Sequence, residues 1–246
     1  PVRGRAVAAQ ARVETVLTLR RGESLLVTLG IPVGVLVFFS AIDLVDTGYP
    51  EPLDFLVPGV LALAVMSSAM VSLGIATGFE RRYGVLKRLG PTPLGRDGLL
   101  VAKTLTVVGL EAIQAVVLVA TGLALGWSPG GGAGGILGAA AVMAVGTVAF
   151  AGLGLLMAGA LRAEATLALA NGAYLVLLLL GGMAFPLERL PGALEDIAGV
   201  LPAAPLAACL RGALTGTGVP AGDLGILAAW AVATPVLAAR LFRWEE

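Results

Sequence analysis

The stretch FLVPGVLALAVMSSAMVSLGIATGF, residues 55–79, contains no charged side chain, and Glu80, Arg81 and Arg82 follow it directly. An α-helix needs roughly 20 mainly apolar residues to cross the hydrocarbon layer of a membrane. A run this continuous lacks the alternation of apolar and polar residues that a membrane-spanning β-strand shows. It therefore predicts a membrane-spanning helix that ends in a cluster of charges.

Five further stretches have the same apolar character: residues 25–42, 99–127, 136–161, 165–185 and 224–242. The whole chain of 246 residues is 58% hydrophobic and only 13% charged, with a mean hydropathy of +0.95. An ordinary soluble domain has about 25% charged residues. We therefore expect an all-α polytopic membrane protein with six transmembrane helices, organised as a single transmembrane domain over residues 1–246.

The composition excludes several classes of enzyme. The chain has no histidine and one cysteine, Cys209, so catalytic triads with histidine, histidine metal sites and paired-cysteine chemistry are excluded. The phosphate-binding pattern GxxxxGK[ST] is absent, because neither Lys87 nor Lys103 follows a glycine. The spans also lack the paired aspartates of an intramembrane aspartyl protease. We expect no catalytic residue, no metal site and no ATP hydrolysis in this chain.

The charges predict the orientation in the membrane. All lysines and arginines except Arg189 and Arg211 fall on one side of the six spans, whereas the loop of residues 43–54 is acidic. Basic residues favour the cytoplasmic side of a membrane. Both termini are therefore expected to be cytoplasmic.

The N-terminal segment, residues 1–24, contains five arginines but also Val13, Val16 and Leu17 at helical spacing. This pattern favours a cytoplasmic interfacial helix that lies on the inner leaflet. A solvated basic tail is the alternative.

The charged loop after the second span, residues 80–98, is expected to contain a short helix from Glu80 to Leu89, which Gly90 and Pro91 end. Its apolar side comprises Val85, Leu86 and Leu89, and its basic side Arg81, Arg82, Lys87 and Arg88. An amphipathic helix outside the membrane is typical of docking into the groove of a partner protein. The alternative is a basic loop anchored on anionic headgroups.

Residues 80–96, ERRYGVLKRLGPTPLGR, followed by Lys103, resemble the cytoplasmic loop of type-2 ABC transporter permeases. These are the membrane subunits of bacterial drug, polysaccharide and lipid exporters, and the loop forms a coupling helix that sits in a cleft of the ATPase subunit. The resemblance implies this contact for Glu80, Arg81, Arg82, Gly84, Leu86, Lys87, Arg88 and Leu89. Tyr83 and Val85 stand where the family often has an acidic residue and a threonine.

The outer region of residues 186–222 is apolar, but its prolines divide it into pieces of about 10 residues, too short to cross a bilayer. Such pieces favour re-entrant or interfacial helices, and the alternative is an outer loop that prolines interrupt. The region also resembles the same family, in which two short half-helices close the export path. The resemblance assigns this outer gate to Phe185, Pro186, Pro191, Pro202 and Arg211.

The resemblance also implies partners. An ABC ATPase subunit in two copies would bind ATP and Mg²⁺, so this chain itself needs no cofactor. Six spans are half of a typical ABC membrane unit, which implies a second permease copy or a sister permease. Membrane lipids are further partners, and no nucleic acid is expected. The implied location is the plasma membrane, or inner membrane, of a bacterium.

Polar residues within the predicted spans are few. Glu111 and Gln114 lie near the middle of the third span, and Asn171 lies in the fifth. An ionisable residue at such a position is costly and marks a functional site by default. These residues are candidates for a substrate path. The alternative is a protonated or hydrogen-bonded Glu111 that ties helices together, for example through Asn171.

Together these features predict the transmembrane subunit of an ABC exporter that is powered by a separate ATPase. The few polar groups in the spans favour a hydrophobic or amphipathic substrate, such as a drug-like molecule, which would connect the chain to antibiotic resistance, or a lipid. The alternative is a standalone secondary transporter of six spans.

Overall fold

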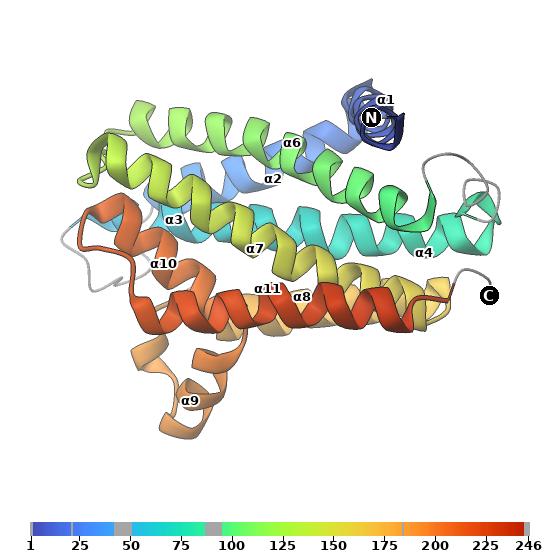
Figure 1. The fold of residues 1–246 in the computed structure, drawn as a ribbon. Coiled ribbons are helices and arrows are strands. Elements are labelled where there is room, and N and C mark those ends of the chain that lie inside the picture. The colour runs from blue at the N-terminus through green and yellow to red at the C-terminus, as the bar shows by residue number, and fades with distance from the viewer. Residues whose placement is uncertain (1, 21, 42–50, 87–94, 184, 244–246) are drawn as a thin grey trace.

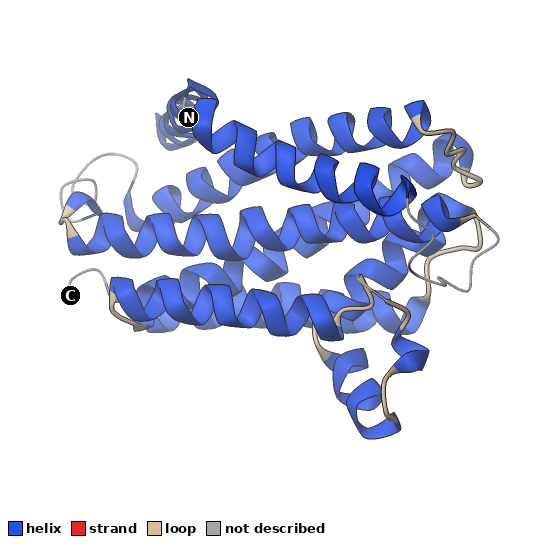
Figure 2. Cartoon of the chain, turned by 180° about the vertical axis from the view of Figure 1, so that it is seen from behind, coloured by secondary structure: helices blue, strands red, loops and turns tan. Residues whose placement is uncertain are grey.

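The chain folds into a helical bundle in a computed structural model, which describes residues 2–20, 22–41, 51–86, 95–183 and 185–243. All regular elements of these residues are helices (Figure 2). Their bounds are α1 Val2–Arg20, α2 Gly22–Ala41, α3 Pro52–Val65, η1 Met66–Ser72, α4 Leu73–Arg82, α6 Gly95–Ala124, α7 Gly132–Ala160, α8 Ala163–Leu180, η2 Leu187–Arg189, α9 Gly192–Val200, α10 Ala203–Thr215 and α11 Ala221–Leu241.

Among the described residues, five helical stretches are long and apolar enough to cross a membrane, or six if the bent pair of α9 and α10 counts as one span. They are Pro52–Arg82, Gly98–Ala124, Gly132–Ala160, Ala163–Leu180 and Ala221–Leu241. The first predicted span falls in α2, whose described apolar part is Thr28–Ala41. The predicted all-α polytopic membrane fold is confirmed.

Several predicted span boundaries were wrong by a few residues, and glycines explain two of them. α6 ends at Ala124 rather than Trp127, because Gly126 has a φ of 95°. α8 ends at Leu180 rather than Phe185, and Gly182 in the following turn has a φ of 61°. Glycine adopts such left-handed backbone conformations with little steric cost.

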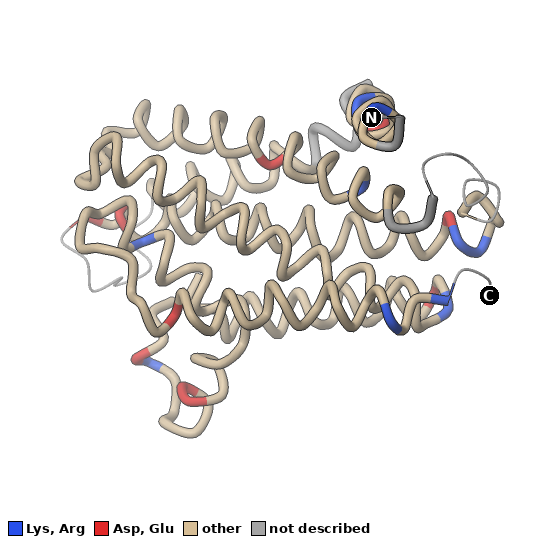
Figure 3. The backbone as a smooth tube through the Cα atoms, in the orientation of Figure 1, with Lys and Arg blue, Asp and Glu red and all other residues tan. Residues whose placement is uncertain are grey.

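The long helices lie side by side along one direction, whereas α1 is seen end-on and therefore crosses the bundle (Figure 1). Most described Lys and Arg residues gather at one end of the bundle, and acidic residues predominate at the other (Figure 3). We call the first the basic end; α4 and α11 end there, in turns that carry Arg81, Arg82 and Arg240. The other is the α9 end.

The second span forms the centre of the bundle. Its helix runs from Pro52 to Arg82 through α3, η1 and α4, and 78% of its most apolar window is buried, against 17–44% in the other four spans. The middle segment, η1, is a π-helix. Glycines allow a close contact with α7: a Cβ added to Gly74 would lie 3.0 Å from the carbonyl oxygen of Gly154.

The region between α8 and α11 consists of short helices, as its prolines predict. Pro186, Pro191 and Pro202 directly precede η2, α9 and α10. α9 and α10 are bent by 79° relative to each other, in the manner of a broken span or a re-entrant loop. In Figure 1, α9 projects away from the bundle, whereas α10 packs against α3 and α7.

Candidate functional site

The charged loop at the basic end differs from the predicted single helix. Glu80 belongs to α4, so the second span itself extends to this point. The chain then turns at Tyr83 and Gly84, where Gly84 has a φ of 70°, and Val85 and Leu86 resume a helical conformation. The helix predicted from Glu80 to Leu89 is therefore interrupted, because a left-handed residue ends a helix. Lys87, Arg88 and Leu89 lie outside the described residues.

Arg81 is buried and forms contacts within the chain. Its guanidinium donates hydrogen bonds to the carbonyl oxygens of Gly159 and Leu161, and a longer one of 3.4 Å to that of Arg243. The last carbonyl groups of a helix lack partners in the helix itself, so Arg81 caps the end of α7 and ties it to α4 and the C-terminal segment. This geometry supports an indirect role, in which Arg81 positions α4.

Leu86 also points inward, since it packs in a small apolar cluster with Leu99 and Phe242. Neighbouring side chains are exposed instead: Tyr83 at 69% and Val85 at 39%. Tyr83 stacks on Phe79, with ring centroids 6.2 Å apart. The sequence predicts Val85 on the apolar docking side and gives Tyr83 only as a departure from the family pattern. Among the described residues of this turn, both are exposed apolar side chains that a partner can reach.

Arg82 is exposed and forms an ion pair with Glu164 at the start of α8. An exposed ion pair contributes little stability, about 0–1 kcal/mol. Arg82 can therefore exchange Glu164 for a carboxylate of another protein at small cost.

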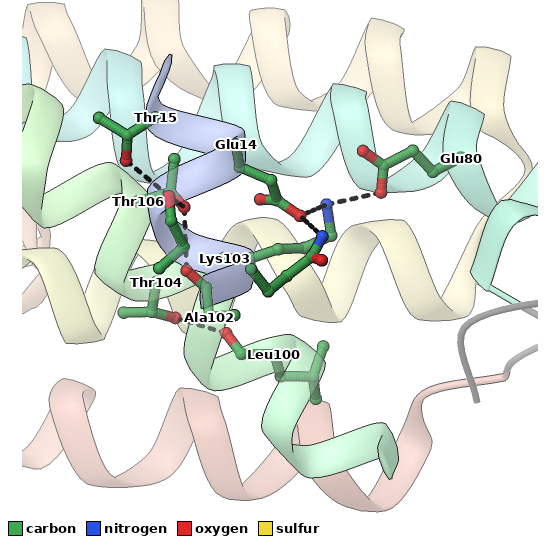
Figure 4. Close-up of polar contacts among 10 residues, drawn as sticks. Glu14, Thr15, Glu80, Leu100, Ala102, Lys103, Thr104 and Thr106 are labelled. Carbon is green, nitrogen blue, oxygen red and sulfur yellow. Dashed lines mark hydrogen bonds and ion pairs between the residues drawn. The ribbon is translucent and has the colours of Figure 1, made fainter. Parts of the chain in front are cut away.

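A nearly buried lysine joins three helices behind this surface. The Lys103 side chain in α6 is 4% exposed, and its Nζ lies 2.5 Å from Glu80 Oε2 in α4 and 3.8 Å from Glu14 Oε1 in α1 (Figure 4). Gln10 Nε2 donates a further hydrogen bond of 2.8 Å to Glu14 Oε1. We call Glu14, Glu80 and Lys103 the Lys103 cluster. A second, weaker contact joins Thr106 Oγ1 in α6 to Ala11 O in α1 at 3.3 Å, because the single hydrogen of this hydroxyl is shared with Ala102 O at 3.0 Å.

The sequence predicts Lys103 as part of the family pattern but does not predict its partners. The sequence could have pointed to Glu14 as a partner, because it is the only acidic residue among the first 20. Its contact with Lys103 links α1 to α6, the helix on which α1 packs.

At the α9 end, Arg211 connects three segments that are distant in sequence. Its guanidinium carbon lies 4.2 Å from the centroid of the buried Phe55 ring in α3, and Nη2 donates a hydrogen bond to the carbonyl oxygen of Gly182. A guanidinium over an aromatic face is attracted by the ring electrons. We call Phe55, Gly182 and Arg211 the Arg211 cluster. Of the residues assigned to the gate, Arg211 holds α10 against the second span, whereas Phe185 is only half-buried.

Two tryptophans fasten the same end of the bundle. Trp127 Nε1 donates a hydrogen bond of 2.9 Å to Asp54 Oδ1 at the start of α3. Trp230 Nε1 in α11 donates one of 2.9 Å to Val200 O at the end of α9. The first bond therefore fastens the turn after α6 to the start of the second span, and the second fastens the end of α9 to α11.

The polar residues within the spans fall into two places. Gln114 accepts a hydrogen bond of 3.0 Å from the Ser68 hydroxyl in η1 and donates one of 3.0 Å to Thr28 O in α2. Glu111, one turn away on α6, is hydrogen-bonded to Thr147 in α7. Asn171 is exposed and donates to Leu167 O of its own helix. The suggested bond between Glu111 and Asn171 is therefore wrong, and Thr147 is the partner.

An apolar groove of about 390 Å³ lies between α6, α7 and α11, with Leu100, Leu105, Leu155 and Pro235 among its lining residues. Within the residues that the structure describes, His, Cys, Asp and Glu side chains form no group of three that could hold a metal ion.

Comparison with known protein families identifies the chain. Residues 7–215 match the family described as ABC-2 type transporter. Comparison with curated protein sequences gives no match. The family match includes most of α1, the spans as far as α8 and the short helices up to the end of α10, so it covers both the Lys103 cluster and the Arg211 cluster. This chain therefore belongs to the ABC-2 type transporter family, whose membrane domain is a transmembrane component of an ABC transporter that works with an ABC ATPase.

Proposed function

We propose that this chain is the membrane subunit of an exporter in which a separate ABC ATPase drives a hydrophobic or amphipathic substrate outward. The observation that carries this proposal is the continuous second span. It ends at the basic end in the exposed turn of Tyr83 and Gly84, and it begins at the α9 end beside Phe55 and Arg211. A push on the turn is therefore transmitted along one helix to the contacts that hold α10.

The ATPase, with ATP and Mg²⁺ bound to it, would dock on the turn, where Tyr83, Val85 and Arg82 are exposed. Two ATPase copies and a second permease, either identical or a sister chain, would complete the transporter. The family match favours this arrangement over a standalone secondary transporter. The apolar groove and the few polar groups in the spans support an apolar or amphipathic substrate over a sugar.

Coupling is tested at Gly84, whose left-handed conformation leaves open space around an added Cβ. This conformation costs an ordinary L-residue about 1–2 kcal/mol, whereas asparagine adopts it more readily. Gly84→Val should therefore reduce ATP-dependent transport about tenfold, while Gly84→Asn stays near wild type. The measurement is substrate flux and ATP hydrolysis in proteoliposomes that contain the co-purified ATPase. Equal flux in the two variants would contradict the role of the turn.

The orientation is part of the proposal: the basic end would face the cytoplasm, as basic residues favour. Single cysteines at the exposed positions Ser128 and Arg162 should react oppositely with a membrane-impermeant thiol reagent in intact cells, in a Cys209→Ser background. Ser128→Cys is expected to be labelled from outside, and Arg162→Cys only after lysis. Labelling of Arg162→Cys from outside in intact cells would show that the orientation is the reverse of the one proposed.

A further inference from the structure

The carboxyl group of Glu111 is enclosed in the bundle. Its side chain is 3% exposed, and its Oε2 is hydrogen-bonded to the Thr147 hydroxyl in α7. Its Oε1 is buried and has no hydrogen-bond partner among the described residues. A buried ionised carboxylate normally requires several donors or a cation, because its removal from water costs several kcal/mol.

The number of hydrogens at Thr147 decides how this contact is made. Thr147 Oγ1 lies 2.8 Å from the carbonyl oxygen of Met143, which can only accept a hydrogen bond. A threonine hydroxyl has one hydrogen, so it cannot donate fully to both Met143 O and a Glu111 carboxylate. Both contacts are satisfied if Glu111 carries a proton and donates it to Thr147, whose own hydrogen then points to Met143 O.

Among the side chains that the structure describes, those of the surrounding helices offer no cation in place of this proton. Neither η1 (MSSAMVS) nor α7 contains a charged residue, and in α2 residues 28–41 contain none either. In α3, the acidic residue Asp54 lies at the α9 end of the helix and accepts a hydrogen bond from Trp127.

The described basic side chains nearer the basic end are either bound to other groups of the chain or exposed. Lys103, on the same helix as Glu111 but about 12 Å nearer the basic end, is bound to Glu80 and Glu14. In α1, which packs on α6 near Thr106, Arg5 and Arg12 are exposed.

We propose that Glu111 is a proton-binding site, in which a neutral carboxylic acid joins α6 to α7 by donating a hydrogen bond to Thr147. This inference stands apart from the proposed coupling to an ATPase. The proton leaves only when α6 and α7 separate and water enters: the O–H bond breaks, the proton passes to water, and a hydrated carboxylate remains. By thermodynamic linkage, release of the proton and separation of α6 from α7 then favour each other to the same extent.

The test is infrared spectroscopy of the purified chain in lipid nanodiscs at pH 7, and it needs no ATPase. Exposed carboxyl groups, with pKa values near 4, are carboxylates at this pH, so a protonated-acid C=O band reports a buried acid. Glu111→Gln, which keeps the size of the side chain, should remove one such band. Thr147→Val should shift that band, and Thr147→Ser should leave it in place.

Glu164→Gln is the matched control, since Glu164 is exposed and paired with Arg82, and this variant should leave the acid band unchanged. If Glu111→Gln removes a carboxylate band and no acid band, the site holds an anion and the proposal is overturned. An acid band that is unaffected by both Glu111→Gln and Thr147→Val would overturn it as well. If Glu111→Gln folds poorly, an unchanged band in Thr147→Val alone overturns the proposal.

Discussion

Replacing Lys103 with methionine should lower the stability of the protein by about 3 kcal/mol, because it removes a nearly buried cation and leaves the half-buried carboxylates of Glu80 and Glu14 without their shared partner. Methionine keeps the apolar stem, so packing is nearly unchanged. For a chain of this length we expect the thermal unfolding midpoint in detergent to fall by about 10 °C. α1 should also become sensitive to limited proteolysis, because the cluster fastens it to α6.

Three further variants separate charge from packing. Lys103→Arg should retain most of the stability, since it keeps the cation. Combining Lys103→Met with Glu14→Gln and Glu80→Gln should recover much of the loss, because neither half-buried carboxylate is then left without its cation. Glu14→Gln alone should have a smaller effect, as Lys103 lies 3.8 Å from Glu14 but 2.5 Å from Glu80. If Lys103→Met has the unfolding midpoint of the wild type and α1 stays protected from proteolysis, the cluster does not hold these helices together.

The second large effect is expected at Gly154, where α7 crosses the second span. A Cβ at this position would lie 2.6 Å from Met70 O and 2.9 Å from Ala69 O, both backbone atoms that cannot rotate away. Gly154→Ala should therefore cost about 1–3 kcal/mol through overpacking. Gly154→Leu should prevent folding. The readout is the yield of monodisperse protein and its unfolding midpoint.

Gly172→Ala provides the matched control, because Gly172 also lies within a spanning helix but an added Cβ meets nothing within 4 Å. Alanine favours a helix by about 0.5–1 kcal/mol over glycine, so this variant should be as stable as wild type or more stable. Equal behaviour of Gly154→Ala and Gly172→Ala would indicate that the close approach of α7 and the second span does not limit stability.

The outline of the fold could be predicted from the sequence because a membrane leaves few options. A backbone in lipid must satisfy its hydrogen bonds within one segment, so a long uncharged run such as residues 55–79 becomes a helix whatever its neighbours are. Prolines divide residues 186–222 into short helices, because a proline lacks the backbone N–H that a continuing helix needs and this effect is also local. The concentration of basic residues at one end is also a property of the sequence, as is the pattern around Glu80 and Gly84 that resembles the family.

Only the tertiary structure decided which neighbours the polar and charged side chains meet. Arg81 and Leu86 appear available for docking in the sequence, yet they turn inward to α7 and to Phe242. Glu111 meets Thr147 rather than Asn171. Lys103 meets Glu14, which is 89 residues earlier in the chain. The physical reason is that lipid and protein interior are equally apolar, so periodicity along a span does not reveal which face a neighbouring helix covers.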